Sequence, residues 1–268
     1  MNKALPPRTT TTTSRNPAID SSSSGTSPTR LQKTVAAALG ISRRKADALV
    51  VAGRVAINGV AATPGSTHLP DATITVDGAP LALPAAATGR IIAYYKPRGQ
   101  ITSRQGADQV FASLPAAPAG RNWLAVGRLD VASEGLLLFT DCGQIVNRLA
   151  HPSAALEREY EVHSPDRIAA ERLAAVCKSG LIIDGRRCRP RLFCILPGGQ
   201  IRYRVVVCEG RNRLVRKMFA CLQARVSRLI RVRFGNLRLP RTLTSGSTVA
   251  VDLARITGKN RGKKPQKC

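Results

Sequence analysis

Asp130 is the carboxylate of this sequence best placed to do chemistry. It ends the segment Val126-Gly127-Arg128-Leu129-Asp130, shortly before the apolar run Gly135-Leu136-Leu137-Leu138-Phe139-Thr140. An ionised aspartate that leaves water needs a partner. In an extended chain, Arg128 would project from the same face and keep the carboxylate ionised. Such an aspartate could be a nucleophile, a base or half of a structural ion pair, and the residues alone do not choose a reaction.

A second candidate site is the basic segment that runs from Glu209 to Met218. An apolar stripe with helical spacing commits one face of this predicted helix to packing, so Arg213, Arg216 and Lys217 must point elsewhere. Helix starts bind phosphate through free N–H groups, and arginines reinforce that binding. A merely solvated basic face is the alternative. We expect three further arginines to extend this basic surface: Arg228, Arg231 and Arg233.

Two weaker candidates accompany these segments. Tyr160 lies in the alternating stretch Glu157–Val162, where a tyrosine is either a half-buried core residue or a platform on which a base stacks. Lys96-Pro97-Arg98-Gly99 is a basic turn after Tyr94 and Tyr95. The three histidines and seven cysteines show no metal-ligand spacing, and no nucleotide-binding motif occurs. The sequence therefore gives no reason to expect a metal or a cofactor.

The charge of the chain predicts a nucleic acid partner. Its 268 residues carry 42 Lys+Arg against 16 Asp+Glu, a formal net charge of +26. Such a field attracts phosphate backbones, and the affinity should fall steeply with salt. No apolar run approaches the roughly 20 residues that span a bilayer, so we expect no membrane association. Cysteines without paired spacing are typical of a reducing compartment, which favours the cytoplasm.

The elements that begin the ordered chain predict a small basic module at residues 29–84. A short helix over 31–40 precedes a second helix, which Ser42 caps and Gly53 ends. Arg43, Arg44 and Lys45 crowd the first turn of that second helix, where cations oppose the helix dipole unless a phosphate binds them. The strand Arg54-Val55-Ala56-Ile57 and an Asn-Gly turn follow. This segment resembles the S4 RNA-binding domain; a generic solvated basic helix is the alternative.

The remaining chain predicts a second, α+β domain over residues 89–255. Strands are expected at 91–95, 136–140, 158–162, 201–208 and 226–234, and helices at 143–150, 167–178 and 212–222. Residues 1–28 form a leader rich in Ser, Thr and Pro that we expect to be disordered, with an organellar transit peptide as the alternative. Residues 85–88 should be a linker, and 256–268 a basic disordered tail.

Taken together, these segments resemble the RsuA-type ribosomal RNA pseudouridine synthases, and within them the RluB-like branch. The resemblance covers roughly residues 30–255, and its blocks occur in the right order. They are the S4-like start, Tyr95-Lys96-Pro97-Arg98-Gly99, Gly127-Arg128-Leu129-Asp130, the Gly135 run, His151-Pro152-Ser153, Glu157-Arg158-Glu159-Tyr160, Glu209–Phe219 and Val226–Gly235.

This resemblance implies an isomerase that detaches a uracil of RNA from its ribose, rotates it and rejoins it through C5. It implies that Asp130 is the catalytic carboxylate, that Arg216 pairs with it and that Tyr160 stacks on the target base. Arg128 would help to hold the flipped nucleotide, at a cost of a few kcal/mol for extrusion. No cofactor is implied, and the fold would be a mixed, largely antiparallel sheet. The other predicted RNA-binding residues are Lys96, Arg98, Arg211, Asn212, Arg213, Lys217, Arg43, Arg44, Lys45 and Arg54.

Several alternatives stay open. The resemblance favours 23S ribosomal RNA as the substrate, with 16S ribosomal RNA or tRNA as alternatives. A non-catalytic S4-type RNA-binding or ribosome-assembly protein would share the charge, and an N-glycosidase that releases uracil would share the attack at C1′. Whether Asp130 adds covalently or abstracts a ribose proton is not fixed by the sequence. We expect a monomer. Relatives usually place an acid where this chain has Cys142, so we expect Asp141 to cap the next helix or that cap to be weaker.

Overall fold

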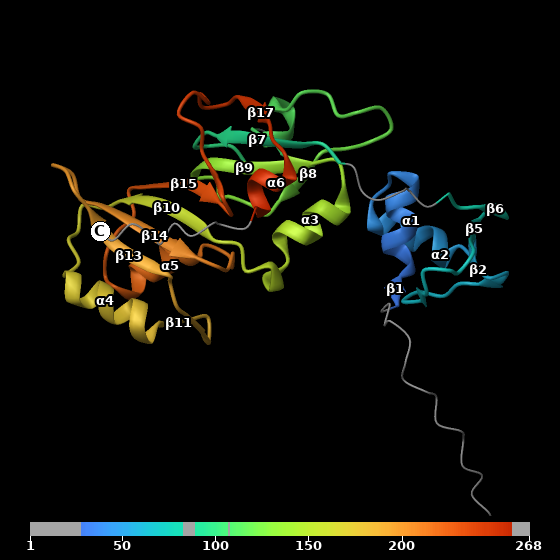
Figure 1. Cartoon of the computed structure of the whole chain (residues 1–268), viewed down its shortest axis with the longest axis horizontal. Coiled ribbons are helices and arrows are strands. Elements are labelled where there is room, and N and C mark those ends of the chain that lie inside the picture. The colour runs from blue at the N-terminus through green and yellow to red at the C-terminus, as the bar shows by residue number, and fades with distance from the viewer. Residues whose placement is uncertain (1–27, 83–88, 107, 259–268) are drawn as a thin grey trace, which may run out of the picture.

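The computed structural model describes residues 28–82, 89–106 and 108–258, and the elements of this part are labelled in Figure 1. The expected leader, the linker at 85–88 and the tail from 259 lie outside the described residues. No helix of the described part is long and apolar enough to cross a membrane.

The first described segment builds the small basic module that the sequence predicts. Ser42 Oγ accepts a hydrogen bond from the N–H of Lys45 at 3.2 Å and thereby caps the second helix. Asn58-Gly59 and Asp77-Gly78 all have positive φ, as tight hairpin turns require. Buried aliphatic side chains from both helices and from two strands form the core of this module. Its elements are β1 (Thr29–Arg30), α1 (Leu31–Leu39), α2 (Arg43–Val51), β2 (Val55–Ile57), β3 (Val60–Ala61), β4 (Thr67–His68), β5 (Ile74–Val76) and β6 (Ala79–Pro80).

A nine-stranded sheet organises the second part of the chain. Its order is β13-β14-β10-β15-β9-β7-β17, with β16 beside β15 and β8 beside β9. Among the described strands of this sheet, only β15 and β9 pair in parallel, so the predicted largely antiparallel α+β fold is confirmed. The strands are β7 (Ile91–Lys96), β8 (Leu124–Val126), β9 (Glu134–Thr140), β10 (Arg158–His163), β13 (Leu192–Leu196), β14 (Arg202–Val207), β15 (Arg228–Phe234), β16 (Leu237–Arg238) and β17 (Thr248–Ala250).

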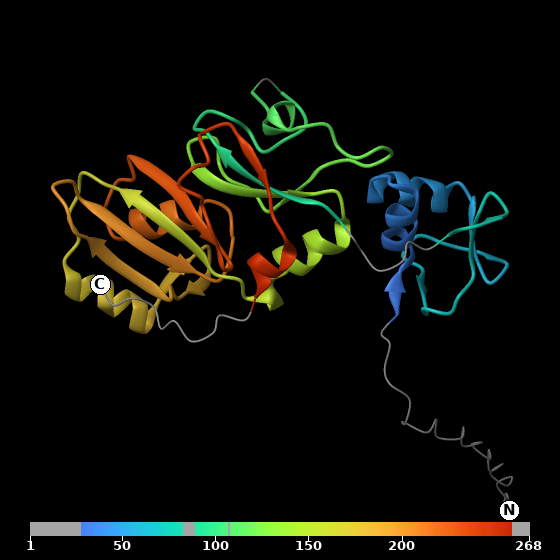
Figure 2. The same cartoon turned by 45° about the horizontal axis from the view of Figure 1, so that its top comes forward.

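Helices pack against both faces of this sheet (Figure 2). On one face, α3 and α6 bury apolar side chains against β7, β9 and the end of β15. On the other face, α4, α5 and the separate β11–β12 hairpin pack with β10, β13 and β14 in a larger core. The bounds of these elements are η1 (Val110–Ser113), α3 (Gly143–Ala150), η2 (Pro152–Ala154), α4 (Ala170–Ser179), β11 (Leu181–Ile183), β12 (Arg186–Cys188), α5 (Leu214–Cys221) and α6 (Leu253–Thr257).

Two predictions about element ends are wrong. Helix α6 runs to Thr257 and its Ile256 is fully buried, so residues 256 and 257 belong to the packed part rather than to a tail. Helix α4 begins at Ala170, three residues after the predicted start. There Ile168 is already buried, and its N–H donates to the Tyr203 hydroxyl, which also donates to the carbonyl of Asp166. That tertiary contact holds the preceding segment in a loop.

Gly135 allows β9 and β15 to approach each other at their parallel pairing. It has a φ of 103°, and a Cβ there would lie 2.4 Å from the carbonyl oxygen of Arg231. No other residue fits both the backbone conformation and the contact. Because Gly135 is the second residue of β9, this close approach also fixes the end of the Asp130 loop.

We expect Gly135→Ala to lower the free energy of unfolding by about 2 kcal/mol or more, since backbone strain and a backbone clash add together. Gly199→Ala is the matched control, because Gly199 has neither a positive φ nor an atom within 4 Å of an added Cβ. Urea unfolding of both variants measures the difference. Equal stability of the two would contradict the argument.

Candidate active site

The Asp130 loop joins β8 to β9 and presents its carboxylate at the end of the sheet. The N–H of Ser133 donates to the carbonyl of Asp130 at 3.0 Å and closes a turn. Leu129 is buried in the larger core, and its carbonyl accepts from Thr102 Oγ1 at 2.9 Å. Asp130 itself is half-buried. The loop is therefore anchored on the residue before the carboxylate and closed by the turn after it.

Two cations hold the backbone that follows Asp130. Lys96, the last residue of β7, is fully buried, and its Nζ donates to the carbonyls of Ser133 at 2.8 Å, Pro97 at 2.9 Å and Val131 at 3.5 Å. Arg216 of α5 donates through Nη2 to the carbonyl of Ala132 at 2.8 Å. The carbonyls of three successive loop residues thus point at buried or half-buried cations, and this arrangement fixes the direction of the loop.

The nearby carboxylates partly compensate for the burial of Lys96 and Arg216. Burial lowers the pKa of Lys96 from its ordinary 10.5 to about 8, and the nearby carboxylates of Glu134 and Asp130 oppose this shift. Burial likewise lowers the pKa of Arg216, and Asp130 again opposes the shift. The Asp130 carboxylate makes no hydrogen bond or ion pair within the described part of the chain. It is held among positive charges while its oxygens stay available.

Tyr160 lies on β10 and packs into the larger core. It pairs in register with Val205 of β14 and Arg231 of β15, and it is 8% exposed. Its side chain belongs to the core that also contains Leu129, beside Asp130, and Val215, beside Arg216. The three predicted catalytic residues therefore come from a loop, a helix and a strand that share one core.

Comparisons with known proteins agree on one family. The model of RNA pseudouridylate synthases matches residues 90–221, and the S4 domain model matches residues 29–74. Ribosomal large subunit pseudouridine synthase B of Salmonella typhimurium is 39% identical over 237 residues, covering 84% of this chain and 80% of that protein. The protein of the same name from Vibrio cholerae is 38% identical over 234 residues, covering 85% and 73%. The chain belongs to the RNA pseudouridine synthase family.

A solved structure supports the assignment. A crystal structure of a pseudouridylate synthase superposes with a TM-score of 0.60 at 25% identity, covering 85% of this chain and 98% of that one. The expected S4 domain at the N-terminus and the expected isomerase activity are therefore confirmed. RNA is the substrate class of this synthase.

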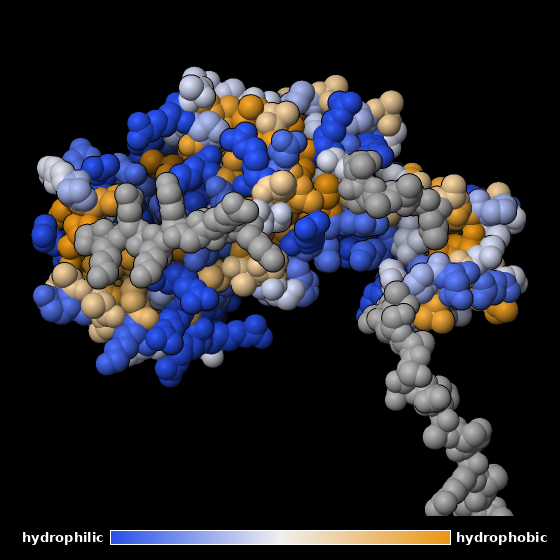
Figure 3. All heavy atoms as spheres, in the orientation of Figure 1, coloured by the Kyte–Doolittle hydropathy of each residue, from blue (hydrophilic) through white to orange (hydrophobic). Residues whose placement is uncertain are grey.

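The predicted RNA-binding residues of the synthase differ in their exposure and in their partners. Arg128, Arg98, Asn212, Arg213, Arg43, Arg44 and Lys45 are exposed, and hydrophilic side chains also gather around the β11 hairpin (Figure 3). Three predicted cations have acidic partners instead: Arg54 pairs with Asp77, Arg211 with Glu209 and Lys217 with Asp184. Lys96 is buried under the Asp130 loop, so its ammonium contacts loop carbonyls where the sequence suggested an RNA phosphate.

Two expectations about arginines are corrected. Arg128 makes no ion pair with Asp130 within the described part, because residues 127–130 form a bent loop with Arg128 facing solvent. The arginines of β15 do not extend the basic surface. Arg231 is buried with its Nε on the carbonyl of Leu136, Arg228 pairs with Glu134, and Arg233 pairs with two glutamates, Glu157 and Glu159.

Asp141 does not cap helix α3. Its carboxylate is almost fully buried and accepts from the N–H of Arg90 at 2.9 Å and from Arg121 Nη1 at 3.3 Å. Cys142 takes the N-cap position without a side-chain hydrogen bond, so the weaker cap is the outcome. Asp141 instead holds the backbone at Arg90, directly before β7.

Sequence reasoning missed the structural role of Lys96. One signal was available: Lys96 is the last residue of an otherwise apolar strand and directly precedes Pro97. A lysine at the end of a buried strand is itself a candidate for burial. A buried lysine requires acceptors for its three N–H groups, and only the folded loop supplies them.

We expect the Lys96 ammonium to leave a pH signature in stability. Because its pKa is about 8 in the folded protein and near 10.5 when unfolded, the unfolded chain binds more protons between these values. Below pH 8 both states are protonated and the burial cost is complete. The wild type should therefore gain stability relative to Lys96→Met as the pH rises from 8 to 10.5.

Denaturant unfolding of wild type and Lys96→Met across that pH range measures this gain. Lys178→Met is the control, because Lys178 is exposed to solvent in the last turn of α4. A constant stability difference between wild type and Lys96→Met from pH 7 to pH 10.5 would refute the assignment.

Proposed function

We propose that this synthase isomerises a uridine of large-subunit ribosomal RNA, with Asp130 as the catalytic carboxylate. The substrate assignment is supported by the relatives at 38–39% identity, which are named for the ribosomal large subunit and which this chain matches over most of their length. The observation that carries the catalytic assignment is a half-buried carboxylate among cations that leave its oxygens unbonded.

The proposed chemistry needs an anion near the ribose and a place for the freed base. The bond between N1 of uracil and C1′ breaks, the base rotates and C5 bonds to C1′. C5 then loses its proton and N1 takes one up, so that no atom is gained or lost overall. Asp130 acts either by adding to the nucleotide or by taking a ribose proton; the site accommodates both roles. Arg216 and Lys96 place positive charge beside this acid and hold its loop in place.

Tyr160 and the exposed cations serve the nucleotide in this proposal. A uridine in folded RNA must leave its stack, which costs a few kcal/mol. Stacking on Tyr160 and contacts from Arg128 offset part of that cost. Arg98, Asn212 and Arg213 face solvent around the site and would bind neighbouring phosphates, while Arg43, Arg44 and Lys45 would bind RNA from the S4 domain.

We expect Asp130→Asn to abolish pseudouridine formation while changing affinity for a 23S ribosomal RNA transcript less than about threefold. The substitution keeps the size of the side chain and removes the charge on which the chemistry depends. Asp252→Asn is the matched control, because Asp252 is exposed and its side chain makes no cap bond.

Pseudouridine is measured by chemical derivatisation and primer extension on RNA from each reaction. Conversion by Asp130→Asn would remove Asp130 from the mechanism. Free uracil in the wild-type reaction would point to the glycosidase alternative, and conversion confined to 16S ribosomal RNA or tRNA would overturn the proposed substrate.

We also expect the affinity for RNA to fall with salt. With about six phosphates neutralised, a double-logarithmic plot of affinity against salt should have a slope of roughly −5. Filter binding between 50 and 200 mM KCl tests this, as a flat response would show that the positive charge does not hold the RNA.

A further inference from the structure

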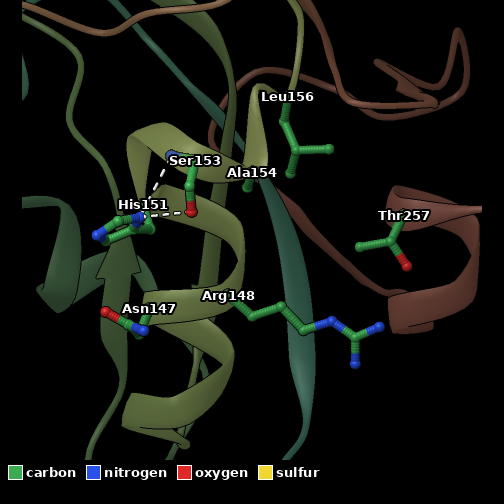
Figure 4. Close-up of a pocket in the computed structure, with 7 residues that line it drawn as sticks. All are labelled: Asn147, Arg148, His151, Ser153, Ala154, Leu156 and Thr257. Atoms are coloured by element: carbon green, nitrogen blue, oxygen red, sulfur yellow. Dashed lines mark hydrogen bonds between the residues drawn. The ribbon is translucent and has the colours of Figure 1, made fainter. Parts of the chain in front are cut away.

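A polar groove lies on the face of the sheet opposite Tyr160. It has a volume of about 560 Å³ and forms where the end of α3 meets η2 and α6 (Figure 4). Its lining contains no acidic residue: it consists of Asn147, Arg148, His151, Ser153, Ala154, Leu156 and Thr257. Helix α3 packs into the core of Ile145 and Leu149, which is distinct from the core around Tyr160. The groove is therefore separate from the catalytic site.

The outer face of α3 that leads into this groove is polar along its whole length. Gln144, Asn147, Arg148 and His151 are all exposed and follow helical spacing. The side chains of Asn147 and Arg148 make no hydrogen bond or ion pair with any residue that the structure describes. Figure 4 shows the Arg148 side chain extended from α3 toward α6, on the side of Thr257. Its guanidinium N–H groups are free for a ligand.

His151 adds a second donor at the rim of the groove. Its Nδ1 accepts from the N–H of Ser153 at 3.2 Å and lies 2.7 Å from Ser153 Oγ. In the neutral ring the proton therefore sits on Nε2. Figure 4 shows that nitrogen on the side of the ring away from Ser153.

The mixture of groups favours a nucleotide over a simple anion. The carbonyls at the end of α3 give that helix end a negative character, which Arg148 offsets only locally. A ligand in the groove can offer acceptors to Arg148 and to His151 Nε2, and a donor to the side-chain oxygen of Asn147. An RNA nucleotide offers both through its phosphate and its 2′-hydroxyl. Ala154 and Leu156 give a ribose or base an apolar surface to contact.

We propose that the α3 groove binds an unpaired nucleotide of the ribosomal RNA substrate, outside the stretch that enters the catalytic site. This inference rests on the proposed function for the identity of the RNA. The position of α3 in the chain supports it. The helix follows β9, which begins directly after the Asp130 loop, and η2 leads through Leu156 to Tyr160 on β10. Asp141, just before α3, accepts a hydrogen bond from the N–H of Arg90, at the start of the synthase domain.

The first test measures the affinity of Arg148→Ala for a 23S ribosomal RNA transcript in excess tRNA. We expect about a tenfold loss, as for a hydrogen bond to a charged group, and a salt slope less steep by about one. Arg241→Ala is the matched control, because Arg241 is exposed and does not line the groove. It should bind within twofold of wild type.

The second test maps the contact directly. The wild-type protein is photo-crosslinked to the same transcript carrying 4-thiouridine, and the crosslinked peptides are identified by mass spectrometry. We expect a crosslink within residues 144–156 that Arg148→Ala weakens and Arg241→Ala does not. Wild-type affinity of Arg148→Ala, or no crosslink in this range, would overturn the proposal; a groove that binds a protein would give that result.

Pseudouridine formation on the same transcript separates this proposal from the proposed function. If the wild type forms pseudouridine but Arg148→Ala binds the transcript as tightly as the wild type, only the proposal for the α3 groove is refuted. Arg148-dependent binding and crosslinking without any conversion refutes the proposed substrate and leaves the groove as an RNA contact.

Discussion

The hydrogen bonds from Lys96 and Arg216 to the Asp130 loop are the constraint on which the proposed active site depends. A loop that exposes one carboxylate would otherwise be free to turn it into bulk water, where it would lose its positive surroundings. Here the carbonyls of Val131, Ala132 and Ser133 accept from two cations on different elements. The Asp130 carboxylate accepts no hydrogen bond from these cations. They act on it through their charge and by holding its backbone, and its lone pairs stay available.

The close approach in the middle of the sheet makes this arrangement possible. Lys96 can reach the loop because it ends β7, which pairs with β9 in a register that places Lys96 opposite Gly135. Gly135 in turn lies against Arg231 of β15, which pairs with Tyr160 of β10. One row of residues across four strands therefore links the lysine under the loop to the tyrosine of the site. A shift of β10 by one residue would turn Tyr160 to the other face of the sheet, and the same shift of β7 would move Lys96 away from the loop.

Much of this architecture could be predicted because its signals are local. The strand at 158–163, the helix at 143–150 and the Ser42 cap follow from alternation, helical spacing and capping chemistry, which do not depend on distant residues. The S4 resemblance and the order of the motifs gave the family. Asp130 and Arg216 could be named together only through that resemblance, since 86 positions separate them and nothing local joins them.

The rest could not be predicted because it depends on which charges meet in space. Arg228, Arg231 and Arg233 look alike in sequence, yet one pairs with Glu134, one is buried on a carbonyl and one is held by two glutamates. Alternation predicts the two faces of a strand but not what covers each face. In a chain with so few acids, most acids of the synthase sheet are taken by structural arginines. The exposed cations without an acidic partner among the described residues, such as Arg98, Arg128 and Arg148, are therefore the ones that we propose contact RNA. In this proposal, ion pairing decides where the protein binds its substrate more than total charge does.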